Sequence, residues 1–417
     1  MATKGKALPD SHANSKILNI ICYGVIMMRM KLLLFITVIT VIAVAVTGCT
    51  AASTSTQTIS ASRSEITTYT TPVVYSGSVP DSIRSFEGTI EEIYNRVNPS
   101  VVNIQVVLAA SALNSGGGAL GSGFVWDTNG DIVTNNHVID GATRITVVFY
   151  DGTTVDAKLV GTDADSDLAV INVKPNGLTL QPVTVADSAL VKVGQLAIAI
   201  GNPFGLQGTM TTGFISGVGR LLPANQNTVG PNYSIPDIIQ TDAAINPGNS
   251  GGVLLDDTGS LIGITQSIAT TSGTSSGVGF AIPSAIIKQV APALISSGHY
   301  DHPYLGVSVA TLNPDIAGAM KLPANQHGAL INTVTAGGPA EKAGLKGSGT
   351  KATVNGASVN VGGDVITAYN GQAVKSSDDL ITFMARSGVV GQTITLTILR
   401  DGKEMQIKVM LAARPNS

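Results

Sequence analysis

With 417 residues, 44% of them apolar, the chain is long enough for two or three domains with hydrophobic cores, which excludes disorder throughout. Charged residues make up only 12%, against about 25% in an average soluble domain, and the formal net charge is −3 without a clustered basic stripe, so we expect no nucleic-acid partner. The two cysteines, Cys22 and Cys49, precede any expected globular region, and the five histidines form no ligand-spaced pair. We therefore expect no disulfide, metal site or cofactor in the folded part.

Residues 30–49 have the order of an export signal. Lys31 precedes an apolar stretch from Leu32 to Thr47, which at about sixteen residues is short for a spanning helix, and small residues follow it. The ending "VTGC" resembles a bacterial lipoprotein signal, in which Cys49 becomes the lipidated first residue of the mature chain. An uncleaved membrane anchor is the main alternative, and a chance likeness is the third. Both leading interpretations place the body of the protein outside the cytoplasm, in the periplasm or at the outer face of the cell membrane.

Two further segments flank this signal. Residues 1–29 fit no export pattern, and Met27, Met28 and Met30 offer later starts, so we interpret residues 1–29 as a doubtful leader produced by too early a start. Residues 50–85 are rich in Ser and Thr and have few large apolar side chains, a composition that cannot repay the entropy of ordering. We expect a flexible linker there, with O-glycosylation as the alternative.

Residues 86–284 read as a domain of many short strands. β-Branched runs at 100–107, 145–161, 195–201 and 260–269 are separated by Gly, Asn and Asp, which predicts an all-β barrel or sandwich. The stretch "YDGTT", residues 150–154, is typical of a hairpin turn. Residues 284–297 then show helical apolar spacing interrupted by Pro292, so we expect a short connecting helix in a linker over 285–302.

Residues 303–413 form a second, smaller unit. We expect strands at 304–310, 328–334, 364–371 and 393–411, and helical segments at 339–345 and 376–388, the latter capped by Ser376 or Ser377. This mixture of hairpins and two helices is typical of an independent domain. The low-charge insertion at 347–363 lengthens it.

Three stretches supply the parts that a serine hydrolase needs: a base, a carboxylate that orients the base, and a nucleophile near oxyanion donors. "TNNHVI" places His137 after an apolar run; taken alone, this histidine is better interpreted as structural. In "TDADSDLAVINV", Asp167 stands where an acidic turn meets a buried strand, as an orienting carboxylate must, while Asp163 and Asp165 have the pattern of solvated turn residues.

The third stretch is "NPGNSGG", residues 246–252. Its glycines tolerate the positive φ of a tight turn, and such a turn can direct the backbone N–H groups of Gly248 and Ser250 at one point, as an oxyanion hole. The chain order His137, Asp167, Ser250 is that of the chymotrypsin type and not of subtilisin or the α/β-hydrolases. The strand-rich pattern of the region agrees with that assignment.

Taken together, "TNNHVI", "DSDLAVI", "GNPFG", "TDAAINPGNSGG" and "GVGFAIPS" resemble the HtrA (Deg) family of trypsin-like serine proteases over residues 86–284. "YLGVSV", "GGPAEKAGL" and "GGDVITAYNGQAV" resemble the family's PDZ domain over 303–413. The resemblance implies a mainly β fold, a chymotrypsin-like double β-barrel followed by one small α+β PDZ domain. It also implies a homotrimer.

The resemblance assigns roles to individual residues. His137 would be the general base, Asp167 its orienting partner and Ser250 the nucleophile, with the Gly248 and Ser250 amides as oxyanion donors. Ala243, Ala244 and Ile245 would line the specificity pocket; none is charged, so we expect cleavage after small aliphatic residues. The strand-forming residues Tyr304, Leu305, Gly306 and Val307 would bind the C-terminus of a peptide.

The expected function is therefore that of an extracytoplasmic serine endopeptidase acting on unfolded or misfolded proteins, in protein quality control and the stress response, with the PDZ domain regulating it or capturing substrate. The alternative is a PDZ-dependent chaperone or binding protein with little proteolysis.

Two positions and one stretch depart from related enzymes. Val253 stands where many relatives have proline, and the stretch 111–122 is short where some carry a regulatory loop. Digestive trypsin-like enzymes have Asp before the nucleophile, to pair with a newly cut N-terminus; Asn249 cannot form that ion pair. We therefore expect activation by loop rearrangement.

Overall fold

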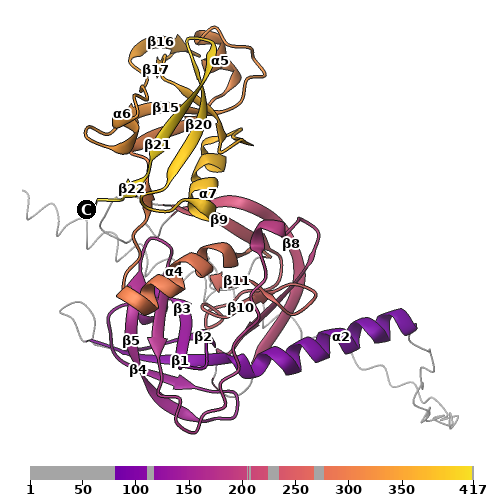
Figure 1. Ribbon diagram of the computed structural model, residues 1–417. Helices are drawn as coiled ribbons and strands as arrows, with labels where there is room; N and C mark the ends of the chain where they lie inside the picture. The colour runs from indigo at the N-terminus through magenta and orange to yellow at the C-terminus, as the bar shows by residue number, and fades with distance from the viewer. Residues whose placement is uncertain are drawn as a thin grey trace, which may run out of the picture. The chain divides into compact units, whose positions relative to one another are not determined.

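A computed structural model describes residues 80–109, 117–203, 205, 208–223, 234–266 and 277–415, which all belong to one unit, Ser78–Ser417 (Figure 1). The predicted leader, the export signal with Cys49, and the linker as far as residue 79 lie outside the described residues. Within the described part, no helix has both the length and the apolar character that crossing a membrane requires.

The first half of the domain expected over residues 86–284 is a closed six-stranded barrel, in the order β1-β2-β3-β6-β5-β4. Its β-branched runs point alternate side chains inward, so that Val102, Ile104, Ile132, Val147 and Ile171 fill the barrel. The predicted Asp-Gly hairpin is confirmed between β4 and β5, where Gly152 has φ 84°. The strands are β1 (Val101–Leu108), β2 (Gly117–Val125), β3 (Asp131–Asn135), β4 (Ala142–Val148), β5 (Thr154–Asp163) and β6 (Leu168–Asn172).

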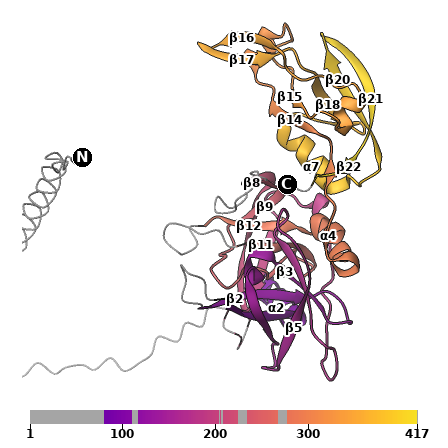
Figure 2. The same cartoon turned by 90° about the vertical axis from the view of Figure 1, so that its left-hand side faces the viewer.

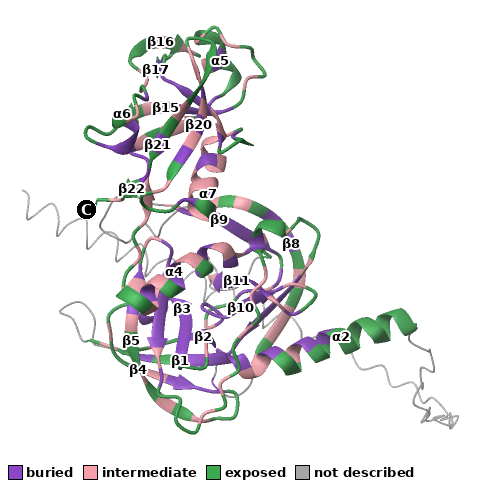
Figure 3. Cartoon of the chain, in the orientation of Figure 1, coloured by how far each residue is buried: buried purple, intermediate pink, exposed green. Residues whose placement is uncertain are grey.

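The second half is another closed barrel, in the order β10-β11-β12-β9-β8-β7. Phe124 and Leu168 from the first barrel and Ile198 and Ile264 from the second belong to one hydrophobic core, which joins the two barrels (Figure 3). The expected double β-barrel is confirmed. Its strands are β7 (Leu196–Gly201), β8 (Thr209–Pro223), β9 (Ser234–Thr241), β10 (Val253–Leu255), β11 (Leu261–Gln266) and β12 (Gly279–Pro283).

Helices flank the barrels. α2 (Asp81–Val97) begins ahead of the predicted domain boundary at residue 86. Its residues Ile90, Ile93 and Val97 share one face that packs into the core. α4 (Ser284–Ser297) has the predicted bounds and runs through the exposed Pro292. It stays helical because Val290 and Leu294 bury its other face. The shorter helices are η1 (Asn98–Ser100), α3 (Asn136–Ile139) and η2 (Ser188–Leu190).

The C-terminal domain is built on a sheet in the order β14-β15-β18-β20-β21, with β19 paired to β18. Ser376 caps α7, and its side chain and that of Asp379 form a reciprocal capping box. The insertion forms its own hairpin, β16–β17, beside this sheet (Figure 2). The elements are β13 (Pro303–Tyr304), β14 (Val307–Thr311), α5 (Pro314–Ala319), β15 (Ala329–Val334), α6 (Pro339–Lys342), β16 (Thr350–Val354), β17 (Ala357–Val361), β18 (Val365–Tyr369), β19 (Gln372–Ala373), α7 (Ser377–Ser387), β20 (Thr393–Arg400), β21 (Lys403–Met410) and β22 (Ala412–Ala413).

Candidate active site

Ser250 lies in the turn that leads from β9 into β10, and both barrels hold this turn. Ser122 on β2 donates its N–H to the carbonyl of Ser250 at 2.7 Å and its Oγ to the carbonyl of Gly248 at 2.7 Å. From the second barrel, the Thr265 hydroxyl donates to the carbonyl of Asn249. Ser250 is therefore fixed between the two barrels.

Two glycines make this turn possible. Gly248 and Gly251 have φ values of 93° and 86°, which side-chain-bearing residues rarely adopt. A Cβ atom on Gly251 would overlap the carbonyl oxygen of Ser122. The tight turn expected from "NPGNSGG" is thus present. The oxyanion role of the Gly248 and Ser250 amides stays a prediction.

The structure brings His137 and Asp167 into contact. His137 lies on the short helix α3, directly after β3, and Asp167 lies in the turn between β5 and β6. The imidazole Nδ1 is 2.7 Å from Asp167 Oδ2, and the backbone N–H of His137 donates to Asp167 Oδ1 at 2.9 Å. Asp167 is 8% exposed. This carboxylate therefore fixes both the ring and the backbone of the histidine.

The electrostatics of the pair favour a basic imidazole. Burial disfavours the charged ring and lowers the pKa of His137, but the hydrogen bond and the negative charge of Asp167 outweigh burial, so the pKa lies above its ordinary value of 6.5. The bond from Nδ1–H to the carboxylate also leaves Nε2 as the basic nitrogen of the neutral ring.

Gln266, at the end of β11, is a contact that sequence reasoning missed. Its Nε2 donates to Asp167 Oδ2 at 3.1 Å, so the carboxylate accepts bonds from two different barrels. The sequence holds no signal for this contact, because a glutamine at a strand end is common and its partner is 99 positions away.

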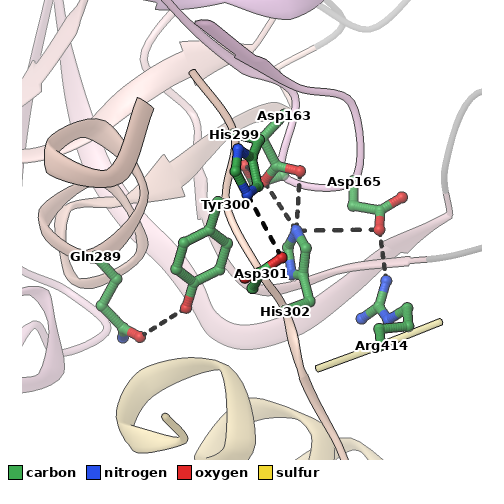
Figure 4. Close-up of polar contacts among 9 residues, drawn as sticks. Asp163, Asp165, Gln289, His299, Tyr300, Asp301, His302 and Arg414 are labelled. Atoms are coloured by element: carbon green, nitrogen blue, oxygen red, sulfur yellow. Dashed lines mark hydrogen bonds and ion pairs between the residues drawn. The ribbon is translucent and has the colours of Figure 1, made fainter. Parts of the chain in front are cut away.

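The structure corrects the expectation that Asp163 is a solvated turn residue. Asp163 is 8% exposed, and both its carboxylate oxygens contact His302 Nε2, at 2.8 and 3.0 Å (Figure 4). It also accepts a hydrogen bond from the Ser166 hydroxyl. Asp165 is half-buried and pairs with Arg414. The acidic residues of this turn are partnered because a segment more than a hundred residues away folds over them.

Among the described residues, Asp163, Asp165 and His302 bring potential metal-ligand atoms within 4.8 Å of one another. Arg414 already supplies a positive charge to Asp165, and His302 Nε2 is bonded to Asp163. The contacts are those of an ion-pair cluster.

The predicted specificity residues lie side by side after β9. Ala243 and Ile245 are buried, and a Cβ on Gly279 of β12 would collide with Ile245. The carbonyl of Ala244 accepts a bond from the Thr211 hydroxyl at 2.9 Å. The segment is therefore held between β8 and β12, and its apolar side chains bring no charge to the site.

The segment Tyr304–Val307 leads from β13 into β14. The carbonyls of Leu305 and Gly306 accept bonds from the N–H groups of Ala340 and Thr335. Because a trans peptide directs its N–H opposite to its C=O, the N–H groups of Gly306 and Val307 face away from the 335–340 loop. The same segment, Leu380 and Met384 of α7, and Leu221 and Pro236 of the N-terminal domain line a cavity of about 370 Å³.

The chain matches two domain families, the trypsin-like peptidase domain over residues 121–264 and the PDZ domain over residues 303–411. It is 41% identical to protease Do-like 1, chloroplastic, of Arabidopsis thaliana over 345 residues, which cover 81% of this chain and 75% of the relative. It is 41% identical to a probable periplasmic serine endoprotease DegP-like of Brucella suis, covering 72% of this chain and 53% of the relative. The chain thus spans about half the length of that bacterial relative.

Solved structures agree with the fold. The HtrA-type protease AlgW with tripeptide superimposes with a TM-score of 0.61 at 34% identity, covering 79% of this chain and 98% of that one. The serine endoprotease from Yersinia pestis gives a TM-score of 0.51 at 29% identity, covering 78% and 98%.

Proposed function

The chain belongs to the HtrA/Deg family of trypsin-like serine endopeptidases with a PDZ domain, and from this premise we propose that His137, Asp167 and Ser250 are its catalytic triad. The observation that carries the proposal is the contact of His137 Nδ1 with Asp167 at 2.7 Å, together with a turn around Ser250 that both barrels hold. The ring nitrogen Nε2 takes the proton of the Ser250 hydroxyl as its oxygen attacks the scissile carbonyl. The N–H groups of Gly248 and Ser250 stabilise the oxyanion.

The later steps use the same groups. The imidazolium returns its proton to the leaving amine as the acyl-enzyme forms, and Asp167 stabilises the charged ring while it exists. Water, deprotonated by His137, then hydrolyses the ester on Ser250.

Removal of the nucleophile tests this mechanism. Ser250→Ala should lower the rate of cleavage of an unfolded protein by at least about 10³-fold, while the variant still captures that protein on a resin. The same experiment separates the enzyme from the alternative of a PDZ-dependent chaperone with little proteolysis. Equal cleavage by the variant and the original protein would remove Ser250 from the mechanism.

The substrates proposed are unfolded or misfolded proteins, cut after small aliphatic residues. The support is the uncharged segment Ala243–Ile245, held between β8 and β12. Mass spectrometry of the fragments of a denatured substrate should show Ala or Val before most cuts. A preference for Lys or Arg would contradict the proposed pocket.

The PDZ domain is proposed to bind peptide C-termini. Backbone N–H groups of the segment Tyr304–Val307 would hold the carboxylate, and the peptide would add as a strand beside β14, in the cavity bordered by α7. A peptide with a free C-terminal carboxylate should bind at least about tenfold more tightly than its amide, as fluorescence anisotropy can measure. Equal affinities would contradict this mode.

The proposed location is extracytoplasmic, with the membrane as a partner through the N-terminal segment. The curated bacterial relatives are named as periplasmic, and residues 30–49 have the pattern of an export signal. Mass spectrometry of the mature N-terminus should find a diacylated Cys49 for a lipoprotein, or residues before it for an uncleaved anchor. A full-length chain in the cytosol would contradict both. A homotrimer is proposed from the family resemblance, and sedimentation would test it.

A further inference from the structure

The proposed oxyanion hole depends on the peptide group that joins Asn249 to Ser250. The N–H of this group belongs to Ser250 and is one of the two donors proposed for the oxyanion. Because a trans peptide group is planar, its N–H points opposite to its C=O. Whatever fixes the carbonyl of Asn249 therefore also fixes the direction of the Ser250 N–H.

Two groups donate hydrogen bonds to the carbonyl of Asn249. The N–H of Gly252 donates at 2.9 Å, within the turn itself. The hydroxyl of Thr265 donates at 2.5 Å, and it comes from β11, which pairs with β10 in the closed second barrel (Figure 1). The contact with Gly252 moves whenever the turn moves, whereas the contact with Thr265 ties the peptide group to the barrel.

The side chain of Thr265 is itself held in place. Thr265 is 0% exposed, and its backbone contacts the same turn on both sides. Its N–H donates to the carbonyl of Gly252 at 2.9 Å, and its carbonyl accepts from the N–H of Gly251 at 2.9 Å. A β-branched side chain also has few χ1 rotamers. The direction of the hydroxyl is therefore set by the fold before any substrate binds.

The hydroxyl has an electrostatic effect as well as a geometric one. A hydrogen bond to the carbonyl polarises the peptide group and makes its N–H a stronger donor. Asn249 and Ser250 are each 5% exposed, and a hydrogen bond is electrostatically stronger in such a buried setting than in water. Donor strength counts most when negative charge develops on the substrate oxygen.

We propose that Thr265 is a positioning residue of the proteolytic reaction, whose hydroxyl directs and strengthens the Ser250 N–H as an oxyanion donor through the carbonyl of Asn249. This inference rests on the proposed function, in which Ser250 is the nucleophile and its N–H an oxyanion donor. Loss of the hydroxyl should slow the step that places negative charge on the substrate. It should leave the binding of the uncharged ground state and the basicity of His137 as they are.

The test uses the full chain with substitutions at this one position. Thr265→Val keeps the shape of the side chain and removes the hydroxyl, and the carbonyl of Asn249 retains its bond from Gly252, so no buried acceptor loses its last partner. Thr265→Ser returns the hydroxyl. One readout is kcat and KM on a short chromogenic peptide from pH 5 to 9. The other compares inhibition by a peptide aldehyde, which Ser250 converts to a tetrahedral hemiacetal, with inhibition by the corresponding peptide alcohol, which cannot form one.

We expect Thr265→Val to lower kcat and the affinity for the aldehyde about tenfold. KM and the affinity for the alcohol should stay within about twofold, and Thr265→Ser should recover most of the loss. Thr367→Val is the matched control, because the Thr367 hydroxyl donates to the carbonyl of Thr397 in the C-terminal domain; it should change none of these values. A Thr265→Val variant with kcat and aldehyde affinity within about twofold of the original protein would overturn the inference.

The pH profile separates this role from an indirect effect on the triad. Gln266, the neighbour of Thr265, donates to Asp167, so a disturbed β11 would alter the carboxylate that orients His137. We expect the acid limb of kcat/KM to stay in place while the plateau falls. A limb that moves together with the loss of kcat would assign the effect to Asp167 and overturn the inference.

A second pair of variants covers the case in which Thr265→Val does not fold. Thr265→Ser and Thr265→Ala both lack the methyl group and differ only in the hydroxyl, so kcat of the serine variant should be about tenfold higher. Equal kcat values would overturn the inference. Cleavage that persists in Ser250→Ala would instead refute the proposed function, whereas unchanged rates in Thr265 variants whose cleavage requires Ser250 refute only the role of Thr265.

Discussion

In the proposed mechanism His137 acts as a base only when its ring is neutral. Because Asp167 raises the pKa of His137 above 6.5, kcat/KM should fall as the pH drops through that raised pKa, so the acid limb of the profile lies above pH 6.5. Asp167→Asn removes the charge that raises the pKa, so the limb should move to lower pH while the plateau falls by about 10⁴-fold. Cleavage rates of a chromogenic peptide from pH 5 to 9 check both effects, and an unmoved limb would contradict the assignment of Asp167.

A second prediction at the residue scale concerns Asn249. Its side chain is 5% exposed, it lies against Gly201, and its Oδ1 has no hydrogen-bond partner within the described residues. Asn249→Asp would bury a carboxylate with no cation beside it, and should cost about 1–3 kcal/mol of unfolding free energy. Urea denaturation measures this cost.

The same variant tests activation. Asn249→Asp should not make activity dependent on cleavage of the N-terminus, because no site for a new terminal amine is expected at this position. Activities of the variant with native and trimmed N-termini should therefore agree. Activity that appears only after trimming would revive the trypsin-like route of activation.

At the scale of the element, the turn between β9 and β10 is held tightly by its surroundings. Gly251→Ala would force a Cβ against the carbonyl of Ser122 at a φ that alanine disfavours, so the turn must shift. We expect kcat to fall at least about tenfold and stability to fall by about 2 kcal/mol.

Gly117→Ala is the matched control. Gly117 lies on β2, has no atom within 4 Å of a built Cβ and does not have positive φ. It should retain full activity on a chromogenic peptide. Full activity in Gly251→Ala as well would show that the nucleophile does not depend on this turn geometry.

At the scale of the whole molecule, one buried ion pair links the two domains. Arg386 at the end of α7 makes a bidentate contact with Asp237 on β9, which is 1% exposed. Burial raises the pKa of Asp237, and the hydrogen bond and charge of Arg386 only partly offset that rise. The carboxylate therefore depends strongly on its partner.

Arg386→Met should leave this buried carboxylate unpaired and weaken the association of the domains by about 3–5 kcal/mol. Limited proteolysis of the segment 298–303 should become faster as a result. The double variant Arg386→Met, Asp237→Leu replaces the pair by apolar groups and should restore resistance. Equal proteolysis of all three proteins would show that the pair does not hold the domains together.

The candidate triad could be proposed from the sequence because its parts occupy separate local patterns whose order along the chain is itself informative. Taken alone, His137 is better interpreted as structural, and only its order along the chain with Asp167 and Ser250 favours a catalytic role. The prediction that Asp163 is a solvated turn residue is wrong, because its partner His302 is 139 positions away and no local pattern records such a contact.

The sequence by itself determined a strand-rich domain, the bounds of α4, a cap at the start of α7 and the candidate triad, because strand alternation, helical spacing, turn glycines and motif order are local properties of the chain. The double β-barrel and the PDZ domain followed from the resemblance of those motifs to the HtrA family. Only the tertiary structure decided that β11 brings Gln266 to Asp167 and that α2 packs into the core through Ile90, Ile93 and Val97. It also decided that Arg386, His302 and Arg414 reach acidic groups of the protease domain. These contacts depend on how barrels, linker and PDZ domain pack, and packing joins residues that no spacing rule connects.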